Sequence, residues 1–150
     1  RALSFQFGLQ AHGYESMGAC CGLLDDNDEV ETIAQDGLHG QKWMEKFAAD
    51  CCLNRGYLVE FEGCRYWCLV SVHARGSIWF PNEAVPGDCE GLMSVRLTGD
   101  KQAAVSLYHR PGREDIDHSV TAVKWGGGGH RGACGFTLTL TQAMALGVIQ

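Results

Sequence analysis

Residues 57–72, with the sequence YLVEFEGCRYWCLVSV, decide the fold of this chain. In the first half, Tyr57, Val59 and Phe61 occupy every second position, which is the period of a β-strand. Glu62-Gly63 then interrupts the alternation, and residues 64–72 are rich in aromatic and β-branched side chains. Both faces of this second run are largely apolar, as is typical of a central strand. We therefore predict a β-hairpin whose second strand lies inside a sheet.

Helical periodicity precedes this hairpin. Asp28 and Glu31 form a capping-box-like start of an amphipathic pattern, which Gly37 and Gly40 interrupt. A second amphipathic pattern covers residues 41–55 and stops at a glycine, a common signal for the end of a helix. The sequence therefore predicts two consecutive helices before the hairpin.

The remaining elements follow from the same two periods. A short edge strand over 77–80 ends at Pro81, and a loop over 82–91 leads to a second hairpin with strands over 92–97 and 103–108. A helix follows, which Asp115 or Asp117 caps and which ends at Lys124-Trp125. The last elements are a strand over 136–140 and a short terminal helix over 141–146. Together they predict an α/β fold: a single domain with a mixed central β-sheet of about five strands and helices packed on its faces. We divide it into an N-terminal helical or linker segment, residues 1–56, and an α/β domain, residues 57–150, on which that segment packs.

Composition limits the classes of function. The chain has 150 residues, of which 45% are hydrophobic and 20% charged, enough for one domain with its own core. Its net charge of −6 works against non-specific binding to long nucleic acid, because such binding depends on the release of counterions by basic side chains. Residues 1–95 hold 6 basic and 14 acidic side chains, whereas residues 96–150 hold 6 and 4, so an anion would prefer the C-terminal third. No apolar run approaches the ~18 residues of a membrane span, so we expect a soluble, cytoplasmic protein without a membrane partner.

Metal binding within this chain is not expected. The eight cysteines lack the regular spacing of a disulfide framework, and we interpret them as reduced, mostly buried thiols. No Cys-x-x-Cys pair occurs, so a structural zinc site is not expected. Asp25, Asp26 and Asp28 have no histidine neighbours, and we interpret them as a solvated helix start rather than as metal ligands.

The candidate site is the run GGGGHRGACGF at residues 126–136, which lies between the predicted helix and the last predicted strand. Trp125 and Phe136 flank the glycines, and the run holds no Ser or Pro, which argues against a flexible linker. Successive glycines let backbone N–H groups converge without obstruction from Cβ atoms, as in loops that cradle phosphate oxygens. A neighbouring imidazole and guanidinium add a donor and a positive charge. The candidate anion-binding residues are Gly126, Gly127, Gly128, Gly129, His130 and Arg131.

Residues 117–136, DHSVTAVKWGGGGHRGACGF, closely resemble the signature of the C-terminal, DHHA-type domain of the DHH phosphoesterase superfamily, D-[VI]-S-x-I-A-x-x-[FHY]-GGGGH-[KR]-x-A-A-G-F. The family also has a strand of the form V-S-L-[RY]-S before this helix, and residues 105–109 of this chain are VSLYH. The resemblance covers residues 103–140. Among the departures from the pattern are His109, His118 and Cys134, at places where the pattern has a serine, a valine or isoleucine, and an alanine.

The resemblance implies a division of labour between two domains. In the family, an N-terminal domain binds two metal ions, usually manganese, through Asp and His clusters that include Asp-His-His. This chain has no such cluster, so we expect no catalytic residues and no cofactor in it, and we predict that the isolated chain is inactive. Because it also lacks a starting Met, we expect it to be a processed chain or a fragment.

The same resemblance implies that the glycine run and His130 face the catalytic domain across a cleft and hold a phosphate or a terminal nucleotide. Tyr108 is placed to stack on a base, and Arg110 to contact phosphate, with Arg113 as a weaker candidate. The expected partners are a small phosphorylated substrate or a short oligonucleotide, and a DHH catalytic domain with its manganese in the same full-length protein.

Three hypotheses about function stay open on the sequence alone. The first is the substrate-binding domain of a DHH-type phosphohydrolase that acts on short oligonucleotides, nucleoside phosphates or another small phosphoester. The second is a non-catalytic RNA-binding module, as in the C-terminal domain of alanyl-tRNA synthetases. The third is an interaction domain in which the glycine run only packs tightly, and a homodimer is compatible with all three.

Overall fold

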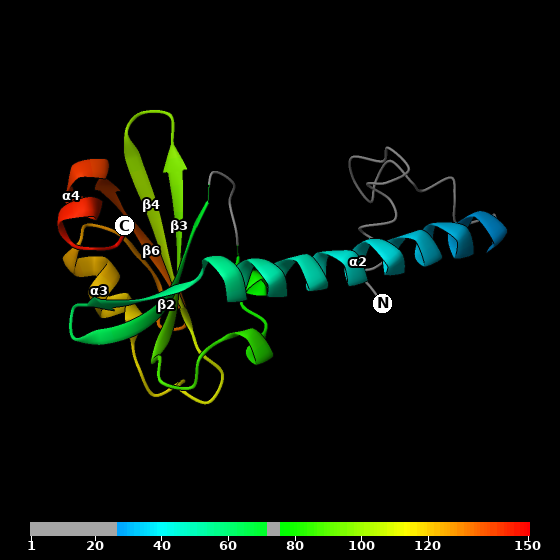
Figure 1. The fold of residues 1–150 in the computed structure, drawn as a ribbon, viewed down its shortest axis with the longest axis horizontal. Helices are drawn as coiled ribbons and strands as arrows, with labels where there is room; N and C mark the ends of the chain where they lie inside the picture. Colours follow the sequence, from blue (N-terminus) through cyan, green and yellow to red (C-terminus); the bar gives the residue numbers. More distant parts are fainter. Residues whose placement is uncertain (1–26, 72–75) are drawn as a thin grey trace. The chain divides into compact units, whose positions relative to one another are not determined.

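The computed structural model describes residues 27–71 and 76–150 (Figure 1). In chain order its elements are α2 (Asn27–Arg55), β1 (Tyr57–Phe61), β2 (Cys64–Ser71), the 3₁₀-helices η2 (Ser77–Trp79) and η3 (Asn82–Ala84), β3 (Gly91–Thr98), β4 (Gln102–His109), α3 (His118–Lys124), β5 (Gly128–His130), β6 (Ala133–Thr139) and α4 (Leu140–Ala145). Among the residues used in the predictions, Cys20, Cys21, Asp25, Asp26 and Val72 lie outside the described ranges.

Contacts within the chain define two compact units, Arg1–Phe47 and Ala48–Gln150. The last eight residues of α2 therefore belong to the same unit as all the described strands. No helix in the described part is both long enough and apolar enough to cross a bilayer.

α2 is a single helix of 29 residues, so the prediction of two helices was wrong. Gly37 and Gly40 both lie within it. A glycine inside a helix costs only about 1 kcal/mol relative to alanine, which the helix-forming residues on either side tolerate. The predicted end is confirmed: Gly56 N–H donates to the Cys52 carbonyl at 3.1 Å, and a Cβ on Gly56 would lie 2.4 Å from the Trp67 ring.

The sheet has six strands in the order β1-β2-β3-β4-β6-β5. β2 and β3 are parallel, and every other neighbouring pair is antiparallel. Both predicted hairpins, β1–β2 and β3–β4, are confirmed, as is the mixed α/β class. β5, which the glycine run itself forms, was not predicted as a strand.

The predicted edge strand over residues 77–80 was wrong, because this segment forms η2. The N–H of Trp79 donates to the Gly76 carbonyl at 3.2 Å, and that of Phe80 to the Ser77 carbonyl at 3.0 Å. These local bonds replace the bonds of a sheet edge. They let both aromatic side chains reach the interior, where each keeps only 5% of its surface exposed.

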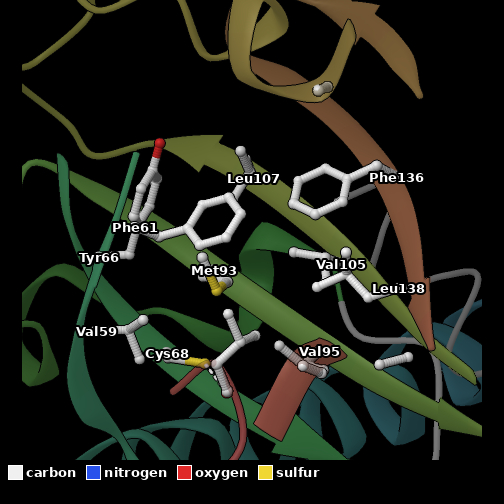
Figure 2. Close-up of a cluster of buried hydrophobic side chains, with 14 of the residues drawn as sticks. Val59, Phe61, Tyr66, Cys68, Met93, Val95, Val105, Leu107, Phe136 and Leu138 are labelled. Atoms are coloured by element: carbon white, nitrogen blue, oxygen red, sulfur yellow. Dashed lines mark hydrogen bonds between the residues drawn. The ribbon is translucent and has the colours of Figure 1, made fainter. Parts of the chain in front are cut away.

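The main core lies on one face of the sheet (Figure 2). Phe61 stacks on Phe136 with ring centroids 5.7 Å apart, and Met93, Val105 and Leu107 are at most 1% exposed. Figure 1 shows α3 and α4 on the same side of the strands, and each contributes a fully buried alanine to this cluster. Full burial of one large apolar side chain contributes about 1.5–3 kcal/mol, so this cluster contributes substantially to the stability of the unit.

The N-terminus of α3 is capped by Asp117, one of the two predicted caps. Its carboxylate accepts the Ser119 N–H at 3.0 Å and the Ser119 hydroxyl at 2.5 Å. The hydrogen bond with Ser119 is the largest cause of a pKa below the usual value for the Asp117 carboxyl. Asp117 therefore fixes the point at which the chain enters the helix that leads to the glycine run.

Asp117→Ala is expected to lower the free energy of unfolding by about 1 kcal/mol, because it leaves the Ser119 N–H at the start of α3 without its acceptor. Asp117→Asn keeps an acceptor oxygen and is expected to retain most of the stability. Urea denaturation of the two variants checks this. An asparagine variant as unstable as the alanine variant would contradict the capping role.

Candidate functional site

The glycine run is an ordered part of the sheet. Gly128–His130 form β5, which pairs with β6 and is the last strand in the sheet order. Gly126 and Gly127 end α3, since their N–H groups donate to the carbonyls of Val123 and Ala122 at 3.0 and 2.8 Å. Gly126 has φ +75°, the left-handed conformation that glycine favours after a helix. The amides of Gly126 and Gly127 are thus already bonded, and Gly128 and Gly129 lie in the β5–β6 ladder, so the run does not present four unpaired N–H groups to a ligand. β5 keeps its outer edge outside the ladder.

The strand register brings two of the predicted site residues to one face. Tyr108 pairs with Ala133, which in turn pairs with His130. Directly paired residues of neighbouring strands project to the same face, and the spacing of two strands places the two outer Cα atoms about 10 Å apart. Cys134 and Leu107, their neighbours along the strands, project into the core on the opposite face. Tyr108 and His130 therefore lie on the face away from the core.

Next to the row of Tyr108, Ala133 and His130, a second row of paired residues on the same face has only small side chains or none. Ser94, Ser106, Gly135 and Gly128 pair in succession across β3, β4, β6 and β5. Gly135 is closely enclosed by backbone, since a Cβ there would lie 2.7 Å from the Val105 carbonyl oxygen. We name the surface of β4, β6 and β5 opposite the core the site face. It carries Ser106, Tyr108, Gly128, His130, Ala133 and Gly135, all half-buried or exposed.

Two arginines beside the site face, Arg110 and Arg131, form no ion pair with any residue in the described ranges. Arg110 Nη1 donates to the Cys89 carbonyl at 3.3 Å, and Arg131 Nη2 donates to the Asp115 carbonyl at 3.0 Å. A guanidinium has five N–H donors, so each keeps its charge and further donors for an anion. Both were predicted as site residues, and their contacts are compatible with that role.

Arg113 differs, because two carboxylates neutralise it. Its guanidinium lies 3.2 Å from Asp115 and 3.5 Å from Glu90. The hydrogen bond from Arg113 is the largest cause of a pKa below the usual value for the Asp115 carboxyl. Arg113 is therefore a poorer candidate for phosphate than Arg110 or Arg131.

Arg96 is a further cation on this side of the sheet, and no sequence motif marks it. It pairs with Ala104, whose neighbours Ala103 and Val105 are core residues, so Arg96 projects to the face away from the core. It is exposed and forms no ion pair with any residue that the structure describes. The alternation of the strand over 92–97 contains the signal that could have found it, since Arg96 is the one cation in that run.

Within residues 27–71 and 76–150, no three His, Cys, Asp or Glu side chains are grouped so that they could hold a metal ion. The six described cysteines are free thiols, of which four are buried. Burial raises the pKa of the Cys68 thiol to about 12, so this sulfur stays protonated and acts as a small apolar group.

His109 and His118, which depart from the family pattern, lie outside the site face. His118 is buried beside Tyr66, and His109 Nε2 contacts the Ile116 carbonyl oxygen at 2.7 Å. Their rings pack together with centroids 5.4 Å apart. Neither ring is therefore placed to contact a ligand on the site face.

No family model matches this chain, and no curated protein matches it. Among solved structures, the chain is similar to PggH, a pGpG-specific phosphodiesterase from Vibrio cholerae, with a TM-score of 0.60 and 12% identity over 81% of this chain and 42% of that one. An uncharacterized protein from Helicobacter pylori G27 matches with a TM-score of 0.41 and 20% identity, over 72% of this chain and 27% of that one. The likeness to PggH shows a shared fold, and the chain spans less than half of the length of PggH.

Proposed function

We propose that this chain is the substrate-binding part of a DHH-type phosphohydrolase and that the site face holds a short phosphorylated substrate. One observation carries the proposal: the register aligns Tyr108 and His130 on one face, beside a row that is nearly free of side chains. An aromatic side chain and an imidazole side chain whose Cα atoms lie about 10 Å apart match a ligand with a base and a phosphate group.

The chemistry of the face favours an anion. The exposed His130 imidazole offers a donor, and the outer edge of β5 adds backbone groups outside the ladder. Arg110 and Arg131 supply positive charge from the adjacent loops. Tyr108 stacks on a base, a contact worth about 1–3 kcal/mol in proteins that bind single strands. The residues of this chain thus bind and orient a ligand.

The charge of the chain favours a small ligand. The net charge of −6 opposes the binding of a long polyanion, whereas the few cations near the site face suffice for one or two phosphates. PggH, which shares the fold, is a phosphodiesterase specific for the dinucleotide pGpG. Short oligonucleotides and nucleoside phosphates are therefore the proposed substrates.

The hydrolytic step belongs to another part of the protein in this proposal. The manganese ions of the DHH family do not fit the described residues, which hold no group of three potential ligands. We place the metal-binding DHH domain elsewhere in the same full-length protein. No step of hydrolysis is assigned to a residue of this chain.

The test is a calorimetric titration of the chain with pGpG, pAp and tRNA. His130→Ala is expected to weaken the binding of pGpG or pAp about 10- to 100-fold, the equivalent of the ~1.5–3 kcal/mol of a hydrogen bond to a charged group. His39→Ala removes an exposed histidine of α2 and serves as the matched control, with unchanged affinity expected. Binding of tRNA alone would favour the RNA-binding alternative, and binding of none of the three would contradict both and favour an interaction domain.

A further inference from the structure

A cluster of three aromatic rings, two of them buried, joins three elements at one end of the sheet. Tyr66 comes from β2, His109 ends β4, and His118 begins α3. His118 is 1% exposed, and its Nδ1 lies 3.1 Å from the Tyr66 hydroxyl. Its ring centroid lies 5.4 Å from those of both Tyr66 and His109. The two histidines that depart from the family pattern thus form one packed unit.

The main chain of both histidines holds the segment that follows His130. The His118 N–H donates to the Arg131 carbonyl and the His109 N–H to the Gly132 carbonyl, both at 3.0 Å. The His109 ring also closes over Gly132, where a Cβ would lie 2.7 Å from Nδ1. The segment is therefore held by the main chain of both histidines and is covered at Gly132 by the His109 ring, so a change of that ring reaches the segment directly.

The same pair holds the loop that carries Arg110. His109 Nε2 and the Ile116 carbonyl oxygen are 2.7 Å apart. A carbonyl only accepts, so in neutral His109 the proton is on Nε2. Arg131 Nη2 also donates to the Asp115 carbonyl at 3.0 Å. The two histidines and Arg131 thus connect the loop 110–117 to the segment after His130.

Burial of the His118 imidazole carries a free-energy penalty. Its Nε2 is buried and has no hydrogen-bond partner among the described residues. A buried polar atom without a partner is rare in native proteins, and an apolar side chain of similar size would avoid the penalty. The contact of His118 Nδ1 with the Tyr66 hydroxyl offsets part of this penalty. It also fixes the orientation of the ring against His109.

We infer that His109 and His118 are positioning residues for the site face. Their ring pair fixes residues 131–132 against the loop 110–117 and thereby sets the position of His130 beside Tyr108. This inference rests on the proposed function for its effect on binding, although the mechanical connection that it describes does not.

The test compares two replacements of His109 in the whole chain, with pGpG as the probe. His109→Leu removes the donor to the Ile116 carbonyl and is expected to weaken pGpG binding about tenfold. His109→Gln supplies an amide donor at a similar reach and is expected to restore the affinity to within about threefold. His39→Leu is the matched control on an exposed histidine, with no change expected.

Amide hydrogen exchange measures the same variants without a ligand. In His109→Leu, the N–H groups of residues 109 and 118, which bond to the segment after His130, are expected to exchange about tenfold faster. The core amides of Val105 and Leu107 should keep their rates. Equal acceleration of the core amides would mean a general structural role and would overturn the inference, as would unchanged exchange or unchanged pGpG affinity in His109→Leu.

The two measurements separate the two proposals. If the unmodified chain does not bind pGpG, the proposed function fails for that ligand, whereas local exchange still decides whether the rings hold the segment. If the chain binds pGpG and His109→Gln is as weak as His109→Leu, the hydrogen bond to Ile116 is not what positions the site, and the inference is overturned.

Discussion

Gly127→Ala is expected to destabilise the domain by about 3 kcal/mol or more, at the upper end of what overpacking costs. A Cβ at this position would lie 2.0 Å from the Gly135 carbonyl oxygen and 2.8 Å from the Phe136 Cα. Both are backbone atoms of β6, a strand paired on both sides. No rotamer change can relieve such a contact, so either the Gly127 N–H bond to Ala122 or the pairing of β5 with β6 has to break.

Gly128→Ala, one residue further on, is the matched control. A Cβ there has no heavy atom within 4 Å, and φ lies outside the left-handed region. We expect the free energy of unfolding to change by less than about 1 kcal/mol, because the new methyl group meets open space. Urea denaturation of both variants checks the difference. Equal losses would mean that the glycines act through general conformational freedom rather than through close packing at Gly127.

The two hairpins were predictable because their signals are local. Alternation over 57–61, the break at Glu62-Gly63 and the dense apolar run after it determine the first hairpin within one stretch of chain. By contrast, nothing local predicts β5. Glycine has a poor strand propensity, and this strand exists because the edge of β6 that does not pair with β4 is available after α3 has ended. In β5, pairing with β6 therefore outweighed the poor strand propensity of glycine.

The two wrong predictions, of two helices in place of α2 and of a strand over 77–80, each gave a local signal too much weight. Gly37 and Gly40 were interpreted as helix ends, yet each imposes only a small penalty that the rest of α2 absorbs. The aromatic residues before Pro81 were interpreted as strand, but turn-like bonds after Gly76 let them bury in η2. Aromatic side chains can thus be buried from a 3₁₀-helix as well as from a strand, so aromatic composition alone does not identify the backbone conformation.

The sequence motif identified which residues belong to the candidate site, but it did not predict how they are arranged in space. The glycine run, His130 and Tyr108 follow from the motif, but 22 positions separate the two side chains, and only the register places them on one face. Arg96 was missed because an exposed arginine in a strand gives no motif. His109 and His118 were visible only as departures from a pattern, and their packing against Tyr66 needed the structure.

His118 is expected to make the stability of the domain depend on pH in a definite window. Burial, and next the charge of His109, lower the pKa of His118 to about 4, whereas Asp117 acts in the opposite direction. In the unfolded chain the pKa of a histidine is about 6.5. The unfolded state therefore binds a proton first, and the free energy of unfolding falls as the pH drops from about 6.5 to about 4, by about 3 kcal/mol in total. Above about pH 6.5 both states are neutral at this residue and the effect vanishes.

His118→Leu isolates this contribution, because leucine cannot titrate. Its unfolding free energy should stay nearly flat between pH 6.5 and 5, where the unmodified chain already loses stability. The lowered carboxyl pKa values, such as that of Asp117, act mainly below this range, since a carboxylate loses its stabilising charge only as the pH falls through its own pKa. Urea denaturation at half-unit pH intervals gives both curves, with His39→Leu as the exposed control. Parallel curves for the unmodified chain and His118→Leu would show that the imidazole is not held neutral by its burial.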